Sequence, residues 1–349
     1  MNEKKSTLAS VAKLAGVSIK TASRVVRRER NVSESTRSKV EDAIREVSYR
    51  PSIAARAAVG RRSYLIGLVF DNPNSDYIVD LLRGAIHQTR EEGYHLIVEP
   101  MRSQDESMIH DLRRLIIQSN LDGVLLPPPI CDSPDVLALL KEQETPYVKI
   151  ASNESSNGGL SVGMDDVSAA ATMTRHLADL GHTNIGFVQG REGTTTTSRR
   201  LEGFQNAMQE RGLAIKSEYI YAGDYTFKAG LLAGEQFFKL ATPPSAIFAS
   251  NDEMAAGVTM AALRSGMSVP DDISIAGFDD SPISRMIWPP LTTIRQPIQA
   301  ISQKAISLLI NELRQIENDD SVATLPFDLI TRRSTATYQV HTAHKKINH

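Results

Sequence analysis

Apolar residues recur along this chain at two different spacings, and the change falls near Ser63. From Thr7 to Pro51 they return at the spacing of an amphipathic helix, in three short blocks. After Ser63, short apolar runs alternate with stretches of helical spacing, which is typical of buried parallel strands separated by helices. The pattern therefore predicts an all-α head of residues 1–50, a linker of residues 51–62 and a larger α/β body.

Each predicted helix of the head begins at a hydroxyl side chain. Thr7, Ser18 and Ser33 can each accept a hydrogen bond from a backbone N–H of the first turn. Gly16 ends the first helix, because glycine adopts left-handed backbone angles without a Cβ penalty. Short helices joined by a glycine turn predict a helix-turn-helix unit. Its inward-facing positions are Leu8, Val11, Ala12, Ala15, Ala22, Val25, Val26, Val40, Ala43, Ile44 and Val47.

The second predicted helix exposes side chains that can read DNA bases. An α-helix fits the major groove, and the side chains of its first turns reach the base edges. Lys20 and Arg24 can donate to guanine, whereas Ile19 offers apolar contact with a thymine methyl group. Phosphate contacts position a protein on DNA without reading sequence. We expect them from Thr7, Ser18, Thr21, Ser23, Arg27, Arg28 and Ser33.

The charge of the chain is unevenly distributed. Residues 1–62 hold fifteen lysines and arginines against six acidic residues, a net charge of +9, so the remainder carries -11 of the total of -2. A basic head on an acidic body is typical of a nucleic-acid-binding module joined to a domain that does not bind DNA. Charge alone leaves a solvated basic face as the alternative.

The stretch VAKLAGVSIKTASRVV resembles the head of the lactose-repressor (LacI/GalR-type) family of bacterial transcriptional regulators. The likeness continues through VSESTRSKVEDAIREVSYRPSIAARA and covers essentially the whole chain. It implies a transcription repressor that binds a near-palindromic operator as a homodimer. It also implies a small effector, a sugar or sugar derivative, which binds between two lobes and switches the affinity for DNA.

The linker is rich in alanine and too short to hold a helix in water by itself. The resemblance implies a hinge helix that enters the minor groove at the operator centre, with contacts from Ala55, Arg56, Ala58 and Val59. A flexible linker is the alternative. The family places a leucine wedge where this chain has Ala58, and a methyl group fills an opened base step poorly.

The body reads as two sets of strands and helices, so we expect two doubly wound lobes with parallel sheets. The expected strands are residues 64–70, 95–100, 122–127, 147–152, 184–190, 219–224, 245–250, 273–279 and 327–335. The expected helices are residues 76–92, 107–119, 134–144, 166–180, 199–211, 226–240, 252–265 and a last one around 301–316. The resemblance implies a periplasmic-binding-protein-like body whose chain crosses between lobes near residues 164, 293 and 324. The first lobe then comprises residues 63–164 and 294–323, the second residues 165–293 and 324–340, and residues 341–349 form a disordered tail.

Polar residues follow several of these strands. Ligands of open α/β sheets bind beyond the carboxyl ends of the strands, so a ligand of two facing lobes belongs in the cleft. Carboxylates, amides, a guanidinium and an aromatic ring together suit a polyhydroxylated ligand, since its hydroxyls need both donors and acceptors. The expected effector contacts are Asp71, Asn72, Arg200, Tyr225, Asn251 and Asp279.

The resemblance supports four of these contacts. Arg200, Asn251 and Asp279 match effector-binding positions of the family, and Tyr225 matches its stacking aromatic residue. The alternative is that Asp and Asn residues cap the helices that follow the strands, as we expect of Asp252. One departure concerns residues 151–152, an Ala-Ser pair where many sugar-responsive members have an aspartate.

Nothing in the sequence indicates an enzyme. The HExxH, GxSxG and Rossmann glycine motifs are absent, and REGTTTTSRR lacks the lysine of a phosphate-binding loop. The single cysteine, Cys131, can form neither an intrachain disulfide nor a CxxC metal site. We therefore expect no catalytic residue, cofactor or metal.

The amino terminus has no apolar stretch typical of a signal peptide, and no run is long enough to span a bilayer. These features predict a cytoplasmic protein without membrane contact. Two alternatives stay open. One is a periplasmic-type small-molecule binding protein without a DNA function, and the other is a DNA-binding protein that does not respond to an effector.

Overall fold

The computed structural model describes residues 7–26, 32–47, 49, 62–150, 159–318 and 321–339. The chain divides into two compact units, Met1–Tyr64 and Leu65–His349. Several positions discussed above lie outside the described residues: Arg27, Arg28, Ala55, Arg56, Ala58, Val59, residues 151–152 and residues 341–349.

Three helices build the described part of the first unit: α1 Leu8–Leu14, α2 Ile19–Val26 and α3 Glu34–Glu46. Their N-termini form as the sequence predicts, because the hydroxyl groups of Thr7, Ser18 and Ser33 accept hydrogen bonds from backbone N–H groups three residues later. Gly16 has a φ of +66° after α1. The core consists of Val11, Ala12, Ala22, Val25, Val40, Ala43 and Tyr49.

The described strands of the second unit form two six-stranded sheets, one in each lobe. The first sheet has the order β11-β5-β4-β3-β1-β2 and is parallel throughout. Its strands are β1 Leu65–Phe70, β2 His95–Pro100, β3 Gly123–Leu126, β4 Tyr147–Ile150, β5 Leu160–Gly163 and β11 Val322–Thr324. The second has the order β12-β10-β9-β8-β6-β7, and β12 alone is antiparallel to its neighbour. Its strands are β6 Ile185–Val188, β7 Ile220–Tyr221, β8 Ala246–Ala249, β9 Ser274–Asp279, β10 Thr292–Arg295 and β12 Asp328–Ile330.

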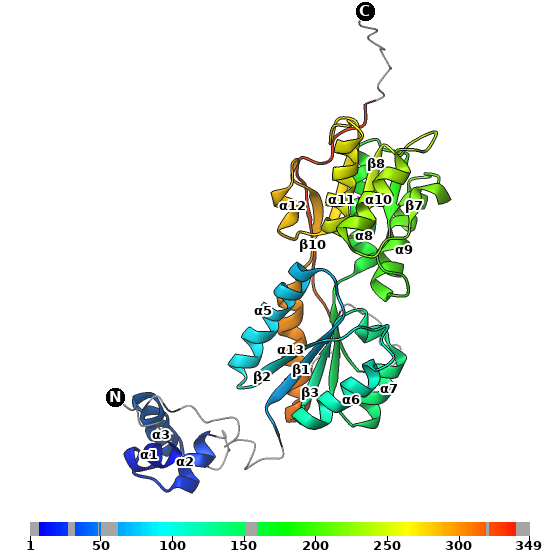
Figure 1. Ribbon diagram of the computed structural model, residues 1–349. Coiled ribbons are helices and arrows are strands. Elements are labelled where there is room, and N and C mark those ends of the chain that lie inside the picture. The colour runs from blue at the N-terminus through cyan, green and yellow to red at the C-terminus, as the bar shows by residue number, and fades with distance from the viewer. Residues whose placement is uncertain are drawn as a thin grey trace, which may run out of the picture. The chain divides into compact units, whose positions relative to one another are not determined.

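Helices cover both faces of the first sheet (Figure 1). On one face lie α5 Ser75–Glu91 and α13 Ile298–Arg314. The two helices approach each other closely at Gly84, where a Cβ atom would overlap the backbone of Gln299. On the other face lie α6 Met108–Ser119 and α7 Pro134–Glu142, with the short 3-10 helix η1 Ile130–Asp132 before α7. Their shared core includes Val69, Leu112, Val124 and Leu139.

The second lobe has the same layered arrangement. The helices α8 Asp166–Asp179 and α9 Thr195–Glu210 pack on one face of its sheet, and α10 Phe227–Phe237 and α11 Asp252–Arg264 on the other. Two short helices, η2 Ser217–Tyr219 and α12 Ile283–Met286, complete it. Together, the helical head and the two doubly wound lobes confirm the predicted fold class. Among the described residues, no helix is long and apolar enough to cross a membrane.

Within the described ranges the chain passes between the two sheets three times: after β5, after β10 and after β11. The second crossing follows Arg295, because β10 extends beyond residue 293 to pair with β9 and β12. Three segments therefore connect the two lobes.

Some element bounds differ from those expected. Helix α9 begins at Thr195 rather than at residue 199, because Thr194 caps it by accepting a hydrogen bond from the N–H of Thr197. The last strand is limited to Asp328–Ile330 within the expected residues 327–335. The short strands β5, β10 and β11 were not expected, since each is only three or four residues long and lacks a distinct apolar run.

Candidate functional site

One face of α2 carries the side chains expected to read bases. Ile19, Lys20 and Arg24 are exposed, and Ile19 retains 56% of its accessible surface, while Ala22 and Val25 are buried on the opposite face. The structure thus places the three expected base-reading residues together at the surface.

Hydroxyl groups expected near phosphates lie at the helix starts. The side chain of Ser18 bonds to the hydroxyl of Thr21 at 2.9 Å, and Thr7 and Ser10 form a reciprocal capping pair at the start of α1. Ser33 caps α3. Helix N-termini with exposed N–H groups are suited to contact phosphate oxygens.

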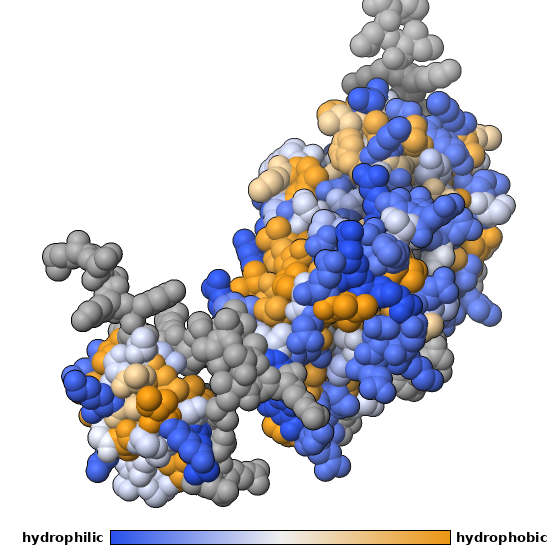
Figure 2. Space-filling view, turned by 60° about the horizontal axis from the view of Figure 1, so that its bottom comes forward, coloured by the Kyte–Doolittle hydropathy of each residue, from blue (hydrophilic) through white to orange (hydrophobic). Residues whose placement is uncertain are grey.

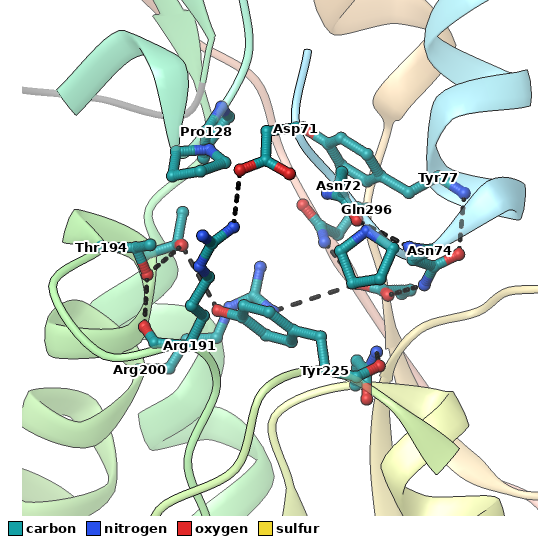
Figure 3. Close-up of a pocket in the computed structure, with 15 residues that line it drawn as sticks. Asp71, Asn72, Asn74, Tyr77, Pro128, Arg191, Thr194, Arg200, Tyr225 and Gln296 are labelled. Carbon is teal, nitrogen blue, oxygen red and sulfur yellow. Dashed lines mark hydrogen bonds and ion pairs between the residues drawn. The ribbon is translucent and has the colours of Figure 1, made fainter. Parts of the chain in front are cut away.

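A cavity lies between the two lobes of the body, and Figure 3 shows side chains entering it from both. The cavity is narrow, because the centre of a water molecule can occupy a volume of about 50 Å³ within it. On the same measure, a cavity of about 10–15 Å³ holds one water molecule. The six side chains expected to contact an effector all line it: Asp71, Asn72, Arg200, Tyr225, Asn251 and Asp279. Lining residues that the sequence reasoning missed are Pro73, Asn74, Tyr77, Pro128, Pro129, Arg191, Thr194, Thr196 and Gln296.

The lining residues follow the carboxyl ends of strands in both sheets. Residues 71–74 come after β1, residues 128–129 after β3, and residues 191–196 after β6. Asn251 follows β8 and Asp279 ends β9. Because parallel strands end at the same edge of a sheet, residues far apart in sequence converge on one cavity.

Arg200 is the centre of a buried electrostatic network in the second lobe. Its Nε donates to Oδ1 of Asp166 at 2.8 Å, and its Nη1 donates to the carbonyl oxygen of Ser250 at 2.7 Å. Its guanidinium also lies 3.7 Å from the centre of the Phe278 ring. A guanidinium has five N–H groups, so Arg200 retains donors for a ligand beside these two bonds.

Asp279 faces Arg200 across this network, with Oδ1 4.0 Å from Nη1. Gln296, which lies just after β10, donates a hydrogen bond of 2.5 Å to Asp279. Asn74, which belongs to the first lobe, donates one of 3.4 Å to the same carboxyl group. Burial raises the pKa of Asp279 to about 6, although Arg200 and Gln296 favour its charged form. At neutral pH the carboxyl group is therefore mostly charged and accepts hydrogen bonds, while its protonated form gains weight as the pH falls toward 6.

Tyr225 is held in an unusual backbone conformation, with a φ of +71°. Its hydroxyl pairs with that of Thr197 at 2.9 Å, and its carbonyl oxygen accepts from Asn251 at 2.9 Å. The ring lies against Gly190, where a Cβ would overlap it. These contacts fix an aromatic wall of the cavity.

The helix cap that we expected at Asp252 is formed by Asn251 instead, so that expectation was wrong. The side chain of Asn251 accepts from the N–H of Met254 at 2.9 Å and caps α11. Asp252 is the first residue of that helix, and its buried carboxylate accepts from Ser281 and Thr293. Both polar ends of the Asn251 amide thus have partners within the protein.

Tyr77 and Arg191 are the most prominent lining residues that the sequence reasoning missed. Tyr77 enters from the start of α5, and burial raises the pKa of its phenol. Arg191 follows β6 and forms an ion pair with Asp71 of the first lobe at 2.9 Å (Figure 3). A usable signal existed for Arg191, because it is the first charged residue after a predicted strand. None existed for Tyr77, which lies within an ordinary amphipathic helix.

The lining combines donors, acceptors and an aromatic ring, which suits a small ligand with several hydroxyl groups. Among the described residues, no group of three or more His, Cys, Asp or Glu side chains is arranged to hold a metal ion.

Comparisons with known proteins agree with this architecture. The family description "Bacterial regulatory proteins, lacI family" matches residues 7–52, and "Periplasmic binding protein-like domain" matches residues 174–335. Catabolite control protein A of Priestia megaterium is 33% identical over 94% of this chain and 99% of its own length. The ribose operon repressor of Escherichia coli (strain K12) is 33% identical over 88% of this chain and 93% of its own length.

Solved structures of the same family resemble this chain in fold. The lac repressor dimer bound to operator and the anti-inducer ONPF superimposes with a TM-score of 0.75 at 26% sequence identity. That comparison covers 95% of this chain and all of the other.

Proposed function

Because this chain belongs to the LacI family of bacterial regulatory proteins, we propose that it represses transcription and that a small effector in the interlobe cavity switches its affinity for operator DNA. One observation carries the proposal. The six side chains expected from the sequence to contact an effector line the same narrow cavity between two lobes. The same chain also has a helix-turn-helix head. A bacterial operator lies in the cytoplasm, so the protein acts there.

We propose that Ile19, Lys20 and Arg24 contact bases in the major groove. Their exposure on one face of α2 supports this role, as does the burial of the opposite face in the head core. The hydroxyl groups of Thr7, Ser18, Thr21, Ser23 and Ser33 then lie near the DNA backbone, as would Arg27 and Arg28. Residues 55–59 would enter the minor groove between the two half-sites.

We propose a homodimer, which would place two heads on the half-sites of a near-palindrome. The similar lac repressor structure is described as a dimer bound to operator. Large apolar side chains also reach the surface of the body: Val79 and Val98 in the first lobe, and Met286 and Trp288 in the second. Figure 2 shows apolar residues exposed among hydrophilic ones on one face of the body.

We propose that the effector is a sugar or sugar derivative. The cavity offers the carboxylates of Asp71 and Asp279, the guanidinium of Arg200 and the ring of Tyr225, and a polyhydroxylated ligand can use all of these groups. A 33% identical relative is named a ribose operon repressor, which agrees with this class.

The first test is binding of the full-length protein to its own promoter region, measured by fluorescence anisotropy at fixed salt with and without a panel of sugars. We expect sequence-selective binding that one compound changes. Selective binding that no sugar alters would contradict the effector, and the absence of selective binding would overturn the whole proposal.

Lys20→Ala tests the recognition helix. We expect it to relax the base preference at one operator position by about 1–3 kcal/mol, because a side chain that donates to a base edge carries that discrimination. Lys39→Ala, on the exposed side of α3, removes the same charge and is the control. Equal selectivity profiles for the two variants, measured by competition with single-base operator mutants, would contradict the assignment of Lys20.

A further inference from the structure

A second depression adjoins the interlobe cavity and shares part of its lining with it. This depression, here called the vestibule, is lined by Asp71, Asn72, Pro73, Arg191, Gly193 and Asp224, among others. Four of these residues, Asp71, Asn72, Pro73 and Arg191, also line the inner cavity. The ion pair between Asp71 and Arg191 therefore lies on the boundary between the two spaces.

The first-lobe side of this ion pair is fixed. Oδ2 of Asp71 accepts from the backbone N–H of Ser103 at 2.9 Å and also from its hydroxyl group. The same oxygen accepts from Nη1 of Arg191, which reaches across from the second lobe. Because the two contacts from Ser103 stay within the first lobe, the contact from Arg191 is the one of these three bonds to Asp71 that has to break when the lobes part.

A second carboxylate of the first lobe holds the same segment. Asp132, at the end of η1, accepts from the backbone N–H of Thr195 at 3.1 Å and from its hydroxyl at 2.7 Å. Thr195 is the first residue of α9, so the carboxylate lies at the positive end of the helix dipole, where negative charge is stabilised. Residues 191–195 are thus joined to the first lobe at both ends.

The segment has glycines that allow it to move. Gly190 precedes it, and Gly193 lies within it at a φ of +77°, a conformation that glycine adopts readily. The exposed fractions of the Arg191 and Asp71 side chains are 25% and 18%, so solvent reaches this pair and salt can weaken it.

We propose that residues 191–195 form a gate between the vestibule and the inner cavity, which Asp71 and Asp132 hold shut from the opposite lobe. The inference rests on the proposed function and concerns the regulation of the same site. Because this pair borders both spaces, a ligand that passes from the vestibule to the inner cavity moves past it, and separation of Asp71 from Arg191 widens that passage. Release of the gate also removes the contacts of Asp71 and Asp132 across the cleft, so the two carboxylates influence how readily the body opens and how tightly it holds an effector.

The test measures the distance between lobes in the full-length protein by pulsed electron paramagnetic resonance. Spin labels are attached through Glu106→Cys in the first lobe and Lys228→Cys in the second, both of which are exposed positions outside the cavity lining. The natural Cys131 is buried and burial raises its pKa well above the usual value, so it competes poorly for the label. The labelled protein is mixed with an excess of unlabelled protein, so that a dimer contains at most one labelled chain and the measured distance lies within that chain.

We expect Arg191→Gln and Asp132→Asn each to shift the main distance to longer values and to broaden its distribution. Added salt should lengthen the distance in the parent protein more than in Arg191→Gln. The matched control is Arg175→Gln, which removes an arginine paired at 2.8 Å with Glu210 inside the second lobe and should leave the distance unchanged. Circular dichroism confirms that each variant is folded.

Because the two variants break separate contacts, loss of folding in one leaves the other as a test. Distances that stay equal to the parent value in a folded variant would overturn the gate. The measurement uses neither DNA nor an effector, so such a result would leave the proposed repressor function to its own test.

Discussion

Tyr225 has a positive φ, which costs a residue with a side chain about 1–3 kcal/mol and persists only where the surroundings enforce it. Here Thr197 binds its hydroxyl, Asn251 binds its carbonyl oxygen, and Gly190 leaves room for its ring. Asp279, on the neighbouring part of the cavity wall, has a φ of +114°. Strain at two lining residues indicates that the fold gives up stability to position them.

Gly190→Ala tests how firmly the ring is held. The backbone of Gly190 does not have a positive φ, so the substitution acts through the overlap of the new methyl group with Tyr225. We expect a loss of about 1–3 kcal/mol in the free energy of unfolding, as for overpacked sites, measured by urea denaturation. The variant should also bind an effector more weakly.

The control is the same substitution in a Tyr225→Ala background, where the ring is absent. There we expect Gly190→Ala to cost much less, so that the two effects are not additive. Equal costs in both backgrounds would show that the ring does not determine the choice of glycine at this position.

The chemistry of individual residues could be predicted in part from sequence. Asp71, Asn251 and Asp279 were identified because they directly follow apolar runs, and the end of a parallel strand points to a ligand site. Tyr77 was missed because it lines the cavity only through the position of the first turn of α5 at the cleft, which the sequence pattern does not reveal. The assignment of the α11 cap to Asp252 failed by one residue, since two adjacent cap-forming residues cannot be distinguished by pattern alone.

At the scale of elements, the long periodic helices and the apolar strands were predictable, and the short elements were not. Strand β10 forms because β9 and β12 pair with it on both sides, and that pairing is not visible in its own residues. Helix α9 begins within a run of threonines, which are poor helix formers, because Thr194 caps it. Tertiary pairing and capping overrode local preference in both cases.

Two histidines hold the segment that follows β12 against the second lobe. Nε2 of His182 lies 3.1 Å from the carbonyl oxygen of Ala336, and Nε2 of His176 lies 3.1 Å from the hydroxyl of Thr335. The ring of His182 also contacts Ser245, Ser274 and the ring of Tyr338. Burial lowers the pKa of both histidines, although the nearby Asp179 favours a charged His176.

This segment makes stability depend on pH. A histidine whose pKa is lowered by folding binds protons more weakly in the native state, so stability is lost as the pH falls below the unfolded value of about 6.5. His182→Gln removes that titration. We expect the parent protein to lose free energy of unfolding relative to this variant between about pH 7 and pH 5, measured by urea denaturation at each pH.

The comparison with His182→Gln is needed because Asp279, with its pKa raised to about 6, acts in the opposite direction over the same range. Its effect is common to both proteins and cancels in the difference. His110→Gln, at an exposed position of α6, controls for the loss of any histidine. A constant difference between the parent and His182→Gln across this range would contradict the prediction.

At the scale of the whole molecule, neither lobe is a continuous piece of chain. Helix α13 and strand β11 return to the first lobe after the second has been built, and β12 then completes the second sheet. Apolar periodicity indicated two lobes, and the positions at which the chain crosses between them were predicted from the family resemblance.

Two large apolar side chains lie at the surface of the second lobe, where we propose that a second copy of the chain packs. Met286 and Trp288 keep 80% and 75% of their surface exposed, although such side chains are usually buried in part. We expect Met286→Asp combined with Trp288→Asp to raise the dissociation constant of the dimer in analytical ultracentrifugation. It should also weaken operator binding, because two linked heads bind far more tightly than one. Ile117→Asp, an exposed apolar position of α6, is the control. An unchanged dimer in the double variant would exclude this surface from the interface and leave the apolar positions of α5 and β2 as the next to test.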